Sequence, residues 1–285
     1  MTLHEFLDLL IRWVHLIAGI MWIGHLWYFN FTQIPNMPKI PDEQKPAVTK
    51  VIAPAALYWF RWGAAWTWLT GFLLAGLIYY HGRIVFEDTS KPGAMLWLLI
   101  FLVLLAVGFV VYNAVMKSVA NVLVANTIVL ALFAAAYLFL EYVGGFGGRS
   151  LYIHAGMIFG TMMAMNVWMV IWPYQKKIIT AIRERTPPDA ALVAQAGLRS
   201  RQNTFMSVPL LFLMISNHYP MIFAAPLNWL WLAGLGIAGW TIRHFFNLKN
   251  AGRMEPQVLV YGALAFVTVA VLNESARPKP PTVAE

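Results

Sequence analysis

The sequence predicts an all-α membrane protein, a polytopic helical bundle of about eight transmembrane helices. The chain has 285 residues, of which 60% are hydrophobic and only 11% are charged, whereas soluble domains are about 45–50% apolar and about a quarter charged. Apolar stretches of about 20 residues, the length that spans the hydrocarbon core, recur along the chain. Thirteen Trp and eleven Tyr are typical of the aromatic belts at membrane–water interfaces. The composition leaves little room for a soluble domain.

The expected spans follow one another from the N-terminus. In order they are 6–30, 57–80, 94–116, 121–143, 151–173, 204–222, 227–247 and 256–273. Prolines mark their ends, as at many helix boundaries, namely Pro54, Pro173, Pro220, Pro226 and Pro256. The sequence therefore predicts a membrane domain over residues 1–273 and a short polar tail, 274–285, which we expect to be disordered.

Two polar links between the spans are longer than the others. The first, QIPNMPKIPDEQKPAVTK, is rich in proline, and we expect a structured loop. The second, YQKKIITAIRERTPPDAALVAQAGLRSRQ, alternates basic and apolar residues. We expect it to hold a short amphipathic helix at the membrane surface.

Basic residues in the loops predict the orientation, because cytoplasmic loops carry an excess of Lys and Arg. The loops after the odd-numbered spans carry twelve: Lys39, Lys45, Lys50, Lys117, Lys176, Lys177, Arg183, Arg185, Arg199, Arg201, Lys249 and Arg253. The opposite side carries five: Arg83, Lys91, Arg149, Arg277 and Lys279. Both termini are therefore expected outside the cytoplasm, in a bacterial-type inner membrane. The net charge of +8 lies in these loops, so membrane lipid and not nucleic acid is the expected partner.

Five of the seven histidines lie inside or at the end of apolar stretches: His15, His25, His154, His218 and His244. Ionisable side chains are costly in a bilayer and usually face a partner in the bundle interior. Neutral imidazole is also the commonest metal ligand. We therefore predict one or two haem b groups with axial ligands drawn from His15, His154, His218 and His244. Depth along the spans places the first three of these toward the outer face and His244 toward the inner face, where His25 is a further candidate.

Other side chains in the apolar stretches extend this interpretation. Arg12 and Arg61 are candidates for binding haem propionates, because Arg pairs with carboxylates in a bidentate manner. Snorkelling to the interface explains both arginines equally well, and for Arg243 it is the favoured explanation. Asn166 and Asn217 could orient a histidine through its second nitrogen. The methionines of TMMAMNVWMV leave copper handling open, although Met is also an ordinary gap-filler in helical cores.

The sequence also excludes several classes of chemistry. The chain has no cysteine, which excludes disulfides, cysteine-ligated clusters and haem attached through C-x-x-C-H. It contains no Gly-rich nucleotide loop, no HExxH and no GxSxG motif. Carboxylates are nearly absent from the middle of the spans, which counts against a proton-coupled transporter.

Four segments resemble the N-terminal membrane domain of the PuuD-type urate hydroxylases: RWVHLIAGIMWIG, HAGMIFGTMMAMNVWMVIWPYQKK, PDAALVAQAGLRSRQNTFMSVPLLFLMISNHYP and RHFFNLKNAGR. The resemblance covers nearly the whole chain, and SNHYP with RHFFN is its most specific part. It implies eight membrane helices and oxidation of urate at the membrane. The first-helix pattern RWxHxxxGxxWxG also resembles membrane protoporphyrinogen oxidases and copper-resistance membrane proteins, in which a first-helix histidine is associated with haem or copper.

The chain departs from that family's pattern in three places. Full-length members carry a C-terminal cytochrome c domain on the outer side, whereas only ESARPKPPTVAE follows the last apolar stretch here. The segment RSRQNT places Gln202 where the family's RSxHNN-like segment has a histidine, and His25 is not part of the pattern. These departures favour a short-form paralogue that passes electrons to a separate cytochrome c or to subunits of a respiratory complex.

Four functions stay open on the sequence alone. The leading hypothesis is a haem b membrane protein that transfers electrons to or from a cytochrome c or quinol at the outer face. The second is an enzyme, a haem-dependent membrane oxidoreductase of urate or a related small-molecule substrate. The third is a structural subunit whose histidines only make interhelical hydrogen bonds. The fourth is a copper-handling protein.

Overall fold

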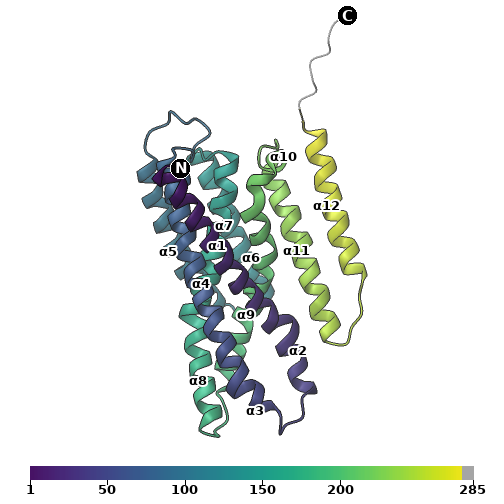
Figure 1. The fold of residues 1–285 in the computed structure, drawn as a ribbon. Coiled ribbons are helices and arrows are strands. Elements are labelled where there is room, and N and C mark those ends of the chain that lie inside the picture. Colours follow the sequence, from purple (N-terminus) through teal and green to yellow (C-terminus); the bar gives the residue numbers. More distant parts are fainter. Residues whose placement is uncertain (278–285) are drawn as a thin grey trace, which may run out of the picture.

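The computed structural model describes residues 1–277, and within this range the chain is helical without a β-strand. The α-helices are α1 (Leu3–Trp27), α2 (Ile34–Asn36), α3 (Lys45–Ala47), α4 (Ala53–Ala75), α5 (Ala94–Ser118), α6 (Val122–Leu138), α7 (Gly148–Met165), α8 (Trp172–Arg183), α9 (Ala190–Ile215), α10 (Pro220–Phe223), α11 (Asn228–Asn250) and α12 (Gln257–Ser275). Short 3₁₀ turns are η2 (Met37–Lys39) and η7 (Ser216–His218). The long helices run side by side as one bundle (Figure 1).

Several of these helices are joined end to end by π-helical segments. The π-helical segments are η1 (Tyr28–Gln33), η3 (Val48–Ile52), η4 (Gly76–His81), η5 (Phe139–Val143) and η6 (Asn166–Ile171). Thus α1, η1 and α2 form one continuous helical rod, and α7, η6 and α8 form another. A π turn holds one residue more than an α turn, so it rotates the side chains that follow it and is frequent at functional sites.

The prediction of an all-α, multi-pass membrane bundle is confirmed. Within the described residues, five helices are long and apolar enough to cross a membrane: Leu3–Lys39, Ala94–Ser118, Val122–Val143, Gly148–Arg183 and Gln257–Ser275. Three further helices, α4, α9 and α11, are of similar length but are not among these five. The N-terminus and the end of α12 lie at the same end of the bundle (Figure 1). The count of eight spans and the orientation in the membrane stay predictions.

Both long polar links prove to be largely helical, which corrects the sequence interpretation. The first helical rod continues to Lys39 and the next begins at Lys45, so the expected loop shrinks to a short turn. The second link does hold a short helix, α8, and its position at the membrane surface stays a prediction. The first part of the link, α8, extends the fifth rod, and its last part opens α9, where Asp189 caps the helix by accepting the backbone N–H of Ala191.

The sixth predicted span, 204–222, is also misplaced. The helix α9 begins fourteen residues earlier, at Ala190, and ends at Ile215, because residues 216–218 tighten into a 3₁₀ turn before Pro220. Arg199 and Arg201, which the orientation argument placed in a loop, therefore lie inside α9. Of the predicted polar tail, residues 274 and 275 complete α12, and residues 278–285 lie outside the described range.

The helix α7 is the core of the bundle. Twelve of its eighteen residues are buried, and it contacts α4, α5, α6 and α9. The glycine pattern in its middle faces α9, where a Cβ added to Gly156 would lie 3.2 Å from the Cβ of Leu213. Small residues allow membrane helices to approach closely, so α7 is surrounded by protein on every side.

A second close approach joins α1 to α4, and it provides a test of the packing. A Cβ added to Gly63 on α4 would lie 2.9 Å from the backbone nitrogen of Trp22 and 3.3 Å from the carbonyl oxygen of Ala18. We expect Gly63→Ala to lower the free energy of unfolding by about 1–3 kcal/mol, because the backbone of α1 must shift. Thermal unfolding of the purified protein in detergent measures this.

The matched control for that substitution lies on the facing helix. A Cβ added to Gly24 on α1 would have no atom within 4 Å, so Gly24→Ala should leave the melting temperature nearly unchanged. Equal melting temperatures for the two variants would contradict the close contact.

Candidate functional site: a polar cleft next to His154

A polar cleft opens at the end of the bundle where the N-terminus and α10 lie (Figure 1). Its volume is about 490 Å³. It forms between the start of α7, the end of the α6–η5 rod, the 82–93 loop and the α10–α11 region. Its polar lining is Glu87, Glu141, Arg149, Ser150 and Asn228, and its apolar walls include Phe86, Phe146 and Phe223.

The 82–93 loop is held over this end by backbone hydrogen bonds. The N–H of Gly147 donates to Val85 at 3.0 Å, and the N–H of Glu87 donates to Gly145 at 3.3 Å. The Lys91 ammonium donates to the carbonyl of Gly144 at 2.8 Å. The loop is therefore part of the cleft wall. It holds Glu87 at the cleft, where a Cβ on Gly147 would lie 2.8 Å from the Glu87 carboxylate.

The cleft offers both signs of charge. The Oε2 atom of Glu141 is buried and has no hydrogen-bond partner. Arg149 is exposed, and its Nε donates to Asn217 Oδ1 at 3.2 Å, which leaves its other N–H groups for a ligand. A cleft with a few convergent polar groups and aromatic walls is the usual form of a small-molecule site. This one suits a small polar molecule that both donates and accepts hydrogen bonds.

His154 lies on α7 one turn from the cleft and is fully buried, at 0% exposed. Its Nδ1 lies 2.8 Å from the carbonyl oxygen of Ser150, and its Nε2 lies 2.9 Å from the hydroxyl of Tyr80. A carbonyl can only accept, so the network assigns the hydrogen to Nδ1. The Tyr80 hydroxyl then donates to Nε2. Both nitrogens are thus engaged by protein, and His154 in this arrangement does not fit as an axial ligand of haem iron.

Aromatic rings enclose the same imidazole. The ring centroids of Phe101 and Phe146 lie 4.7 and 4.8 Å away, both edge to face. Ser150 is one of the residues that line the cleft, although it is 0% exposed, and its hydroxyl lies 3.2 Å from His154 Nδ1. Ser150 therefore connects the cleft to the buried His154–Tyr80 pair.

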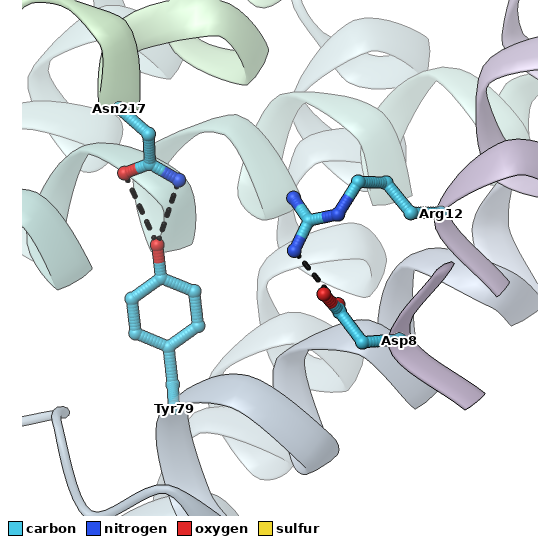
Figure 2. Close-up of polar contacts among 4 residues, drawn as sticks. All are labelled: Asp8, Arg12, Tyr79 and Asn217. Carbon is cyan, nitrogen blue, oxygen red and sulfur yellow. Dashed lines mark hydrogen bonds and ion pairs between the residues drawn. The ribbon is translucent and has the colours of Figure 1, made fainter. Parts of the chain in front are cut away.

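The neighbouring tyrosine of the same π-helical segment faces a second polar group. The hydroxyl of Tyr79 lies 3.2 Å from Oδ1 and 3.1 Å from Nδ2 of Asn217 (Figure 2). Asn217 therefore contacts Tyr79 and Arg149, and it does not orient a histidine ring as the sequence suggested. Arg12 is paired with Asp8 at 2.7 Å on α1 (Figure 2).

His15 on α1 does fit as a haem ligand. Its Nδ1 lies 3.0 Å from the hydroxyl of Thr70, and that hydroxyl donates to the carbonyl of Trp66 at 2.6 Å. The hydroxyl can therefore only accept from His15, which places the hydrogen on Nδ1 and leaves the lone pair of Nε2 free. Metal-binding histidines are commonly oriented through the second nitrogen in this way. Gly71 makes room beside the ring, since a Cβ there would lie 3.1 Å from His15 Cε1.

The remaining histidines are spread over the bundle. His218 and His244 are exposed, and His25 is half-buried with its Nδ1 2.7 Å from the carbonyl of Met21. Among the described residues, no hydrogen bond or ring contact joins any two of the predicted ligands, and no three His, Asp or Glu side chains gather as a metal-binding group. The ligand set stays a prediction.

The arginines have partners other than a propionate. Arg61 stacks on the ring of Trp172, with its guanidinium carbon 3.9 Å from the centroid. Arg243 is only 2% exposed and lies 4.5 Å from the centroid of Phe31. Its interpretation as a snorkelling residue is therefore wrong, because the side chain turns into the bundle.

Sequence reasoning missed most of the cleft. Tyr80 reads as one more aromatic residue of an interfacial belt, and Ser150 and Glu141 lie in no motif. The useful signal was the position of His154 near the start of a span, with a serine one turn before it. No pattern in the sequence indicated that the loop after α4 would fold over the start of α7.

One family model matches most of the chain. A family model described as urate oxidase N-terminal matches residues 40–274. No curated protein and no solved structure matches the chain. The matched range includes the cleft, Tyr80 and His154, while His15 on α1 precedes it.

The Tyr80–His154 hydrogen bond can be tested directly. We expect Tyr80→Phe to lower the free energy of unfolding by about 1–3 kcal/mol, because it leaves the buried Nε2 of His154 without a partner. Thermal unfolding in detergent measures the change. Tyr142→Phe, at a tyrosine that is 73% exposed, should have no measurable effect. If both variants have the same melting temperature as the wild type, the buried hydrogen bond is absent.

Proposed function

The chain belongs to the urate oxidase N-terminal family, and from this premise we propose that it is a membrane oxidoreductase domain that binds urate or a related small substrate in the polar cleft. The observation that carries the proposal is the cleft itself, about 490 Å³ in volume and lined by Arg149, Glu87 and Glu141. The predicted orientation places it on the outer side of a bacterial-type inner membrane.

The cleft matches the chemistry of urate. Urate is a planar oxopurine with ring N–H donors, carbonyl acceptors and a negative charge near neutral pH. Arg149 can donate to its oxygens, and charge-assisted bonds of this kind are about twice as strong as neutral ones. The carboxylate of Glu141, whose Oε2 has no partner, can accept from ring N–H groups. The phenylalanine walls suit the apolar faces of the ring.

His154 and Tyr80 act as positioning residues in this proposal. Tyr80 and the carbonyl of Ser150 hold the imidazole neutral and in one tautomer. The imidazole lies 3.2 Å from the Ser150 hydroxyl, and so restricts the orientation of that hydroxyl in the cleft wall. A fixed hydroxyl beside a bound substrate fixes where a substrate N–H or carbonyl can bond.

Oxidation of urate also requires an acceptor for the electrons, and His15 supports a haem b for that purpose. Its free Nε2 and the hydrogen bond to Thr70 are what an axial ligand needs. When bound, a haem b would supply one-electron chemistry there, with an oxidised cytochrome c or a quinone as the onward electron acceptor. Electron transfer without substrate chemistry is the second candidate function, and it rests on the same free nitrogen of His15.

Urate binding tests the first candidate. We expect the detergent-purified protein to bind radiolabelled urate, and Arg149→Gln to weaken the equilibrium affinity by roughly ten- to a hundredfold, because a hydrogen bond to a charged group is lost. Arg277→Gln is the control, since Arg277 is exposed at the same end of the bundle and pairs with Glu274 at 3.1 Å. The proposal fails if the wild type does not bind urate or if both variants lose affinity equally.

A reduced-minus-oxidised optical spectrum tests the haem. We expect a b-type spectrum in the wild type, its loss in His15→Ala, and its retention in His81→Ala, whose ring is exposed against that of His4. A pyridine haemochrome assay gives the number of haems per chain. A flat wild-type spectrum at full protein loading, or a spectrum unchanged in His15→Ala, would overturn the assignment.

A further inference from the structure

A second polar cluster lies on the other half of the bundle, away from the cleft. It joins four helical rods through α5, α6, η6 and α9. We call it the inner network; its members are Tyr112, Asn113, Asn126, Asn166, Arg199, Gln202 and Asn203. Nothing in the proposed function uses these residues.

The amides and the phenol of the inner network bond to one another, although Asn166 Oδ1 is buried without a partner. Tyr112 donates to Gln202 Oε1 at 2.9 Å and accepts from Asn166 Nδ2 at 2.8 Å. The other hydrogen of Asn166 Nδ2 goes to Asn203 Oδ1 at 2.8 Å. Gln202 Nε2 donates to Asn126 Oδ1 at 3.2 Å. These groups are therefore held in fixed positions around the Tyr112 ring.

Arg199 is the member of the network whose charge has no counter-charge nearby. It is 0% exposed. Its Nη2 donates to Asn113 Oδ1 at 2.7 Å, and its guanidinium carbon lies 4.9 Å from the centroid of Tyr112. Its Nε and Nη1 are buried without any hydrogen-bond partner. None of the ion pairs among the described residues includes Arg199.

A buried arginine in this state lacks what such a charge normally needs. A guanidinium is a permanent positive charge in proteins, and an unpaired buried charge is strongly destabilising. The neighbours supply the side-chain and backbone oxygens of Asn113 and one aromatic face, all of them neutral. A guanidinium with unpartnered N–H groups on a rigid frame matches a carboxylate or oxyanion, which accepts charge-assisted hydrogen bonds.

The position of the network indicates where an anion would come from. Asn113 lies five residues before the end of α5 at Ser118, a rise of roughly 8 Å at 1.5 Å per residue. The α5–α6 turn belongs to the side that carries most of the Lys and Arg residues. A small anion in the aqueous phase on that side is attracted by these charges and has a short distance to travel.

We propose that Arg199 and Asn113 form a binding site for a small carboxylate or oxyanion of about the size of formate. The anion accepts a charge-assisted hydrogen bond from an unpartnered N–H group of Arg199 and supplies its counter-charge, while Asn113 and Tyr112 hold the guanidinium in place. The site is separate from the cleft and does not depend on urate binding or on haem.

Two substitutions distinguish this site from a merely structural arginine. Arg199→Gln removes the charge. Asn113→Asp keeps Arg199 and places a carboxylate where the amide oxygen lies 2.7 Å from Nη2, so it provides an internal counter-charge and makes the external anion unnecessary. Arg201→Gln, two residues along α9 and exposed, is the matched control.

The experiment measures the melting temperature of the full chain in detergent as sodium formate rises at constant ionic strength, with sodium gluconate as the bulky balancing salt. We expect a saturable increase for the wild type and for Arg201→Gln, and none for Arg199→Gln or Asn113→Asp. In formate-free buffer, Asn113→Asp should melt above the wild type. No saturable shift in the wild type, or the same shift in Asn113→Asp, would overturn the proposal; because Asn113→Asp keeps the arginine, misfolding of Arg199→Gln alone cannot decide it.

Discussion

The bundle depends on one constraint: a polar group inside a membrane must find its partner within the protein. The helix α7 shows how this is met, because most of its residues are buried and several of its polar side chains have partners on other helices. His154 bonds to Tyr80 in η4, the segment that continues α4. Asn166, which lies in η6 directly after α7, bonds to Tyr112 in α5 and to Asn203 in α9. Helices that share little hydrophobic driving force are thus fixed in register by a few specific bonds.

The π-helical segments decide where those bonds form. Tyr79 and Tyr80 lie in η4, Glu141 lies in η5 and Asn166 lies in η6. The extra residue of a π turn changes which side chains face inward. Adjacent tyrosines can therefore both be buried, as Tyr79 and Tyr80 are, although neighbours on a regular helix point about 100° apart.

This explains how far the sequence could predict the molecule. Apolar length predicts the helical rods well, because the hydrocarbon core sets that length. The rule that basic residues lie in loops failed at Arg199, because a network of amides and a tyrosine on three other rods allows α9 to carry the charge inside. The histidines were correctly singled out as unusual, but their state depends on partners far away in sequence. Thr70 leaves one nitrogen of His15 free, whereas Tyr80 and Ser150 occupy both nitrogens of His154.

Gln202 links the inner network to the resemblance noted in the sequence, which leads us to expect a histidine in its place. The glutamine accepts from Tyr112 and donates to Asn126, and a neutral histidine also offers one donor and one acceptor. Glutamine can therefore make the same bridge between α5 and α6 as the expected histidine, but it has no group that titrates near neutral pH. A difference at this position would affect proton exchange and not architecture. The polar cleft of the proposed function, with Glu141 and Arg149 in its lining, is separate from this position.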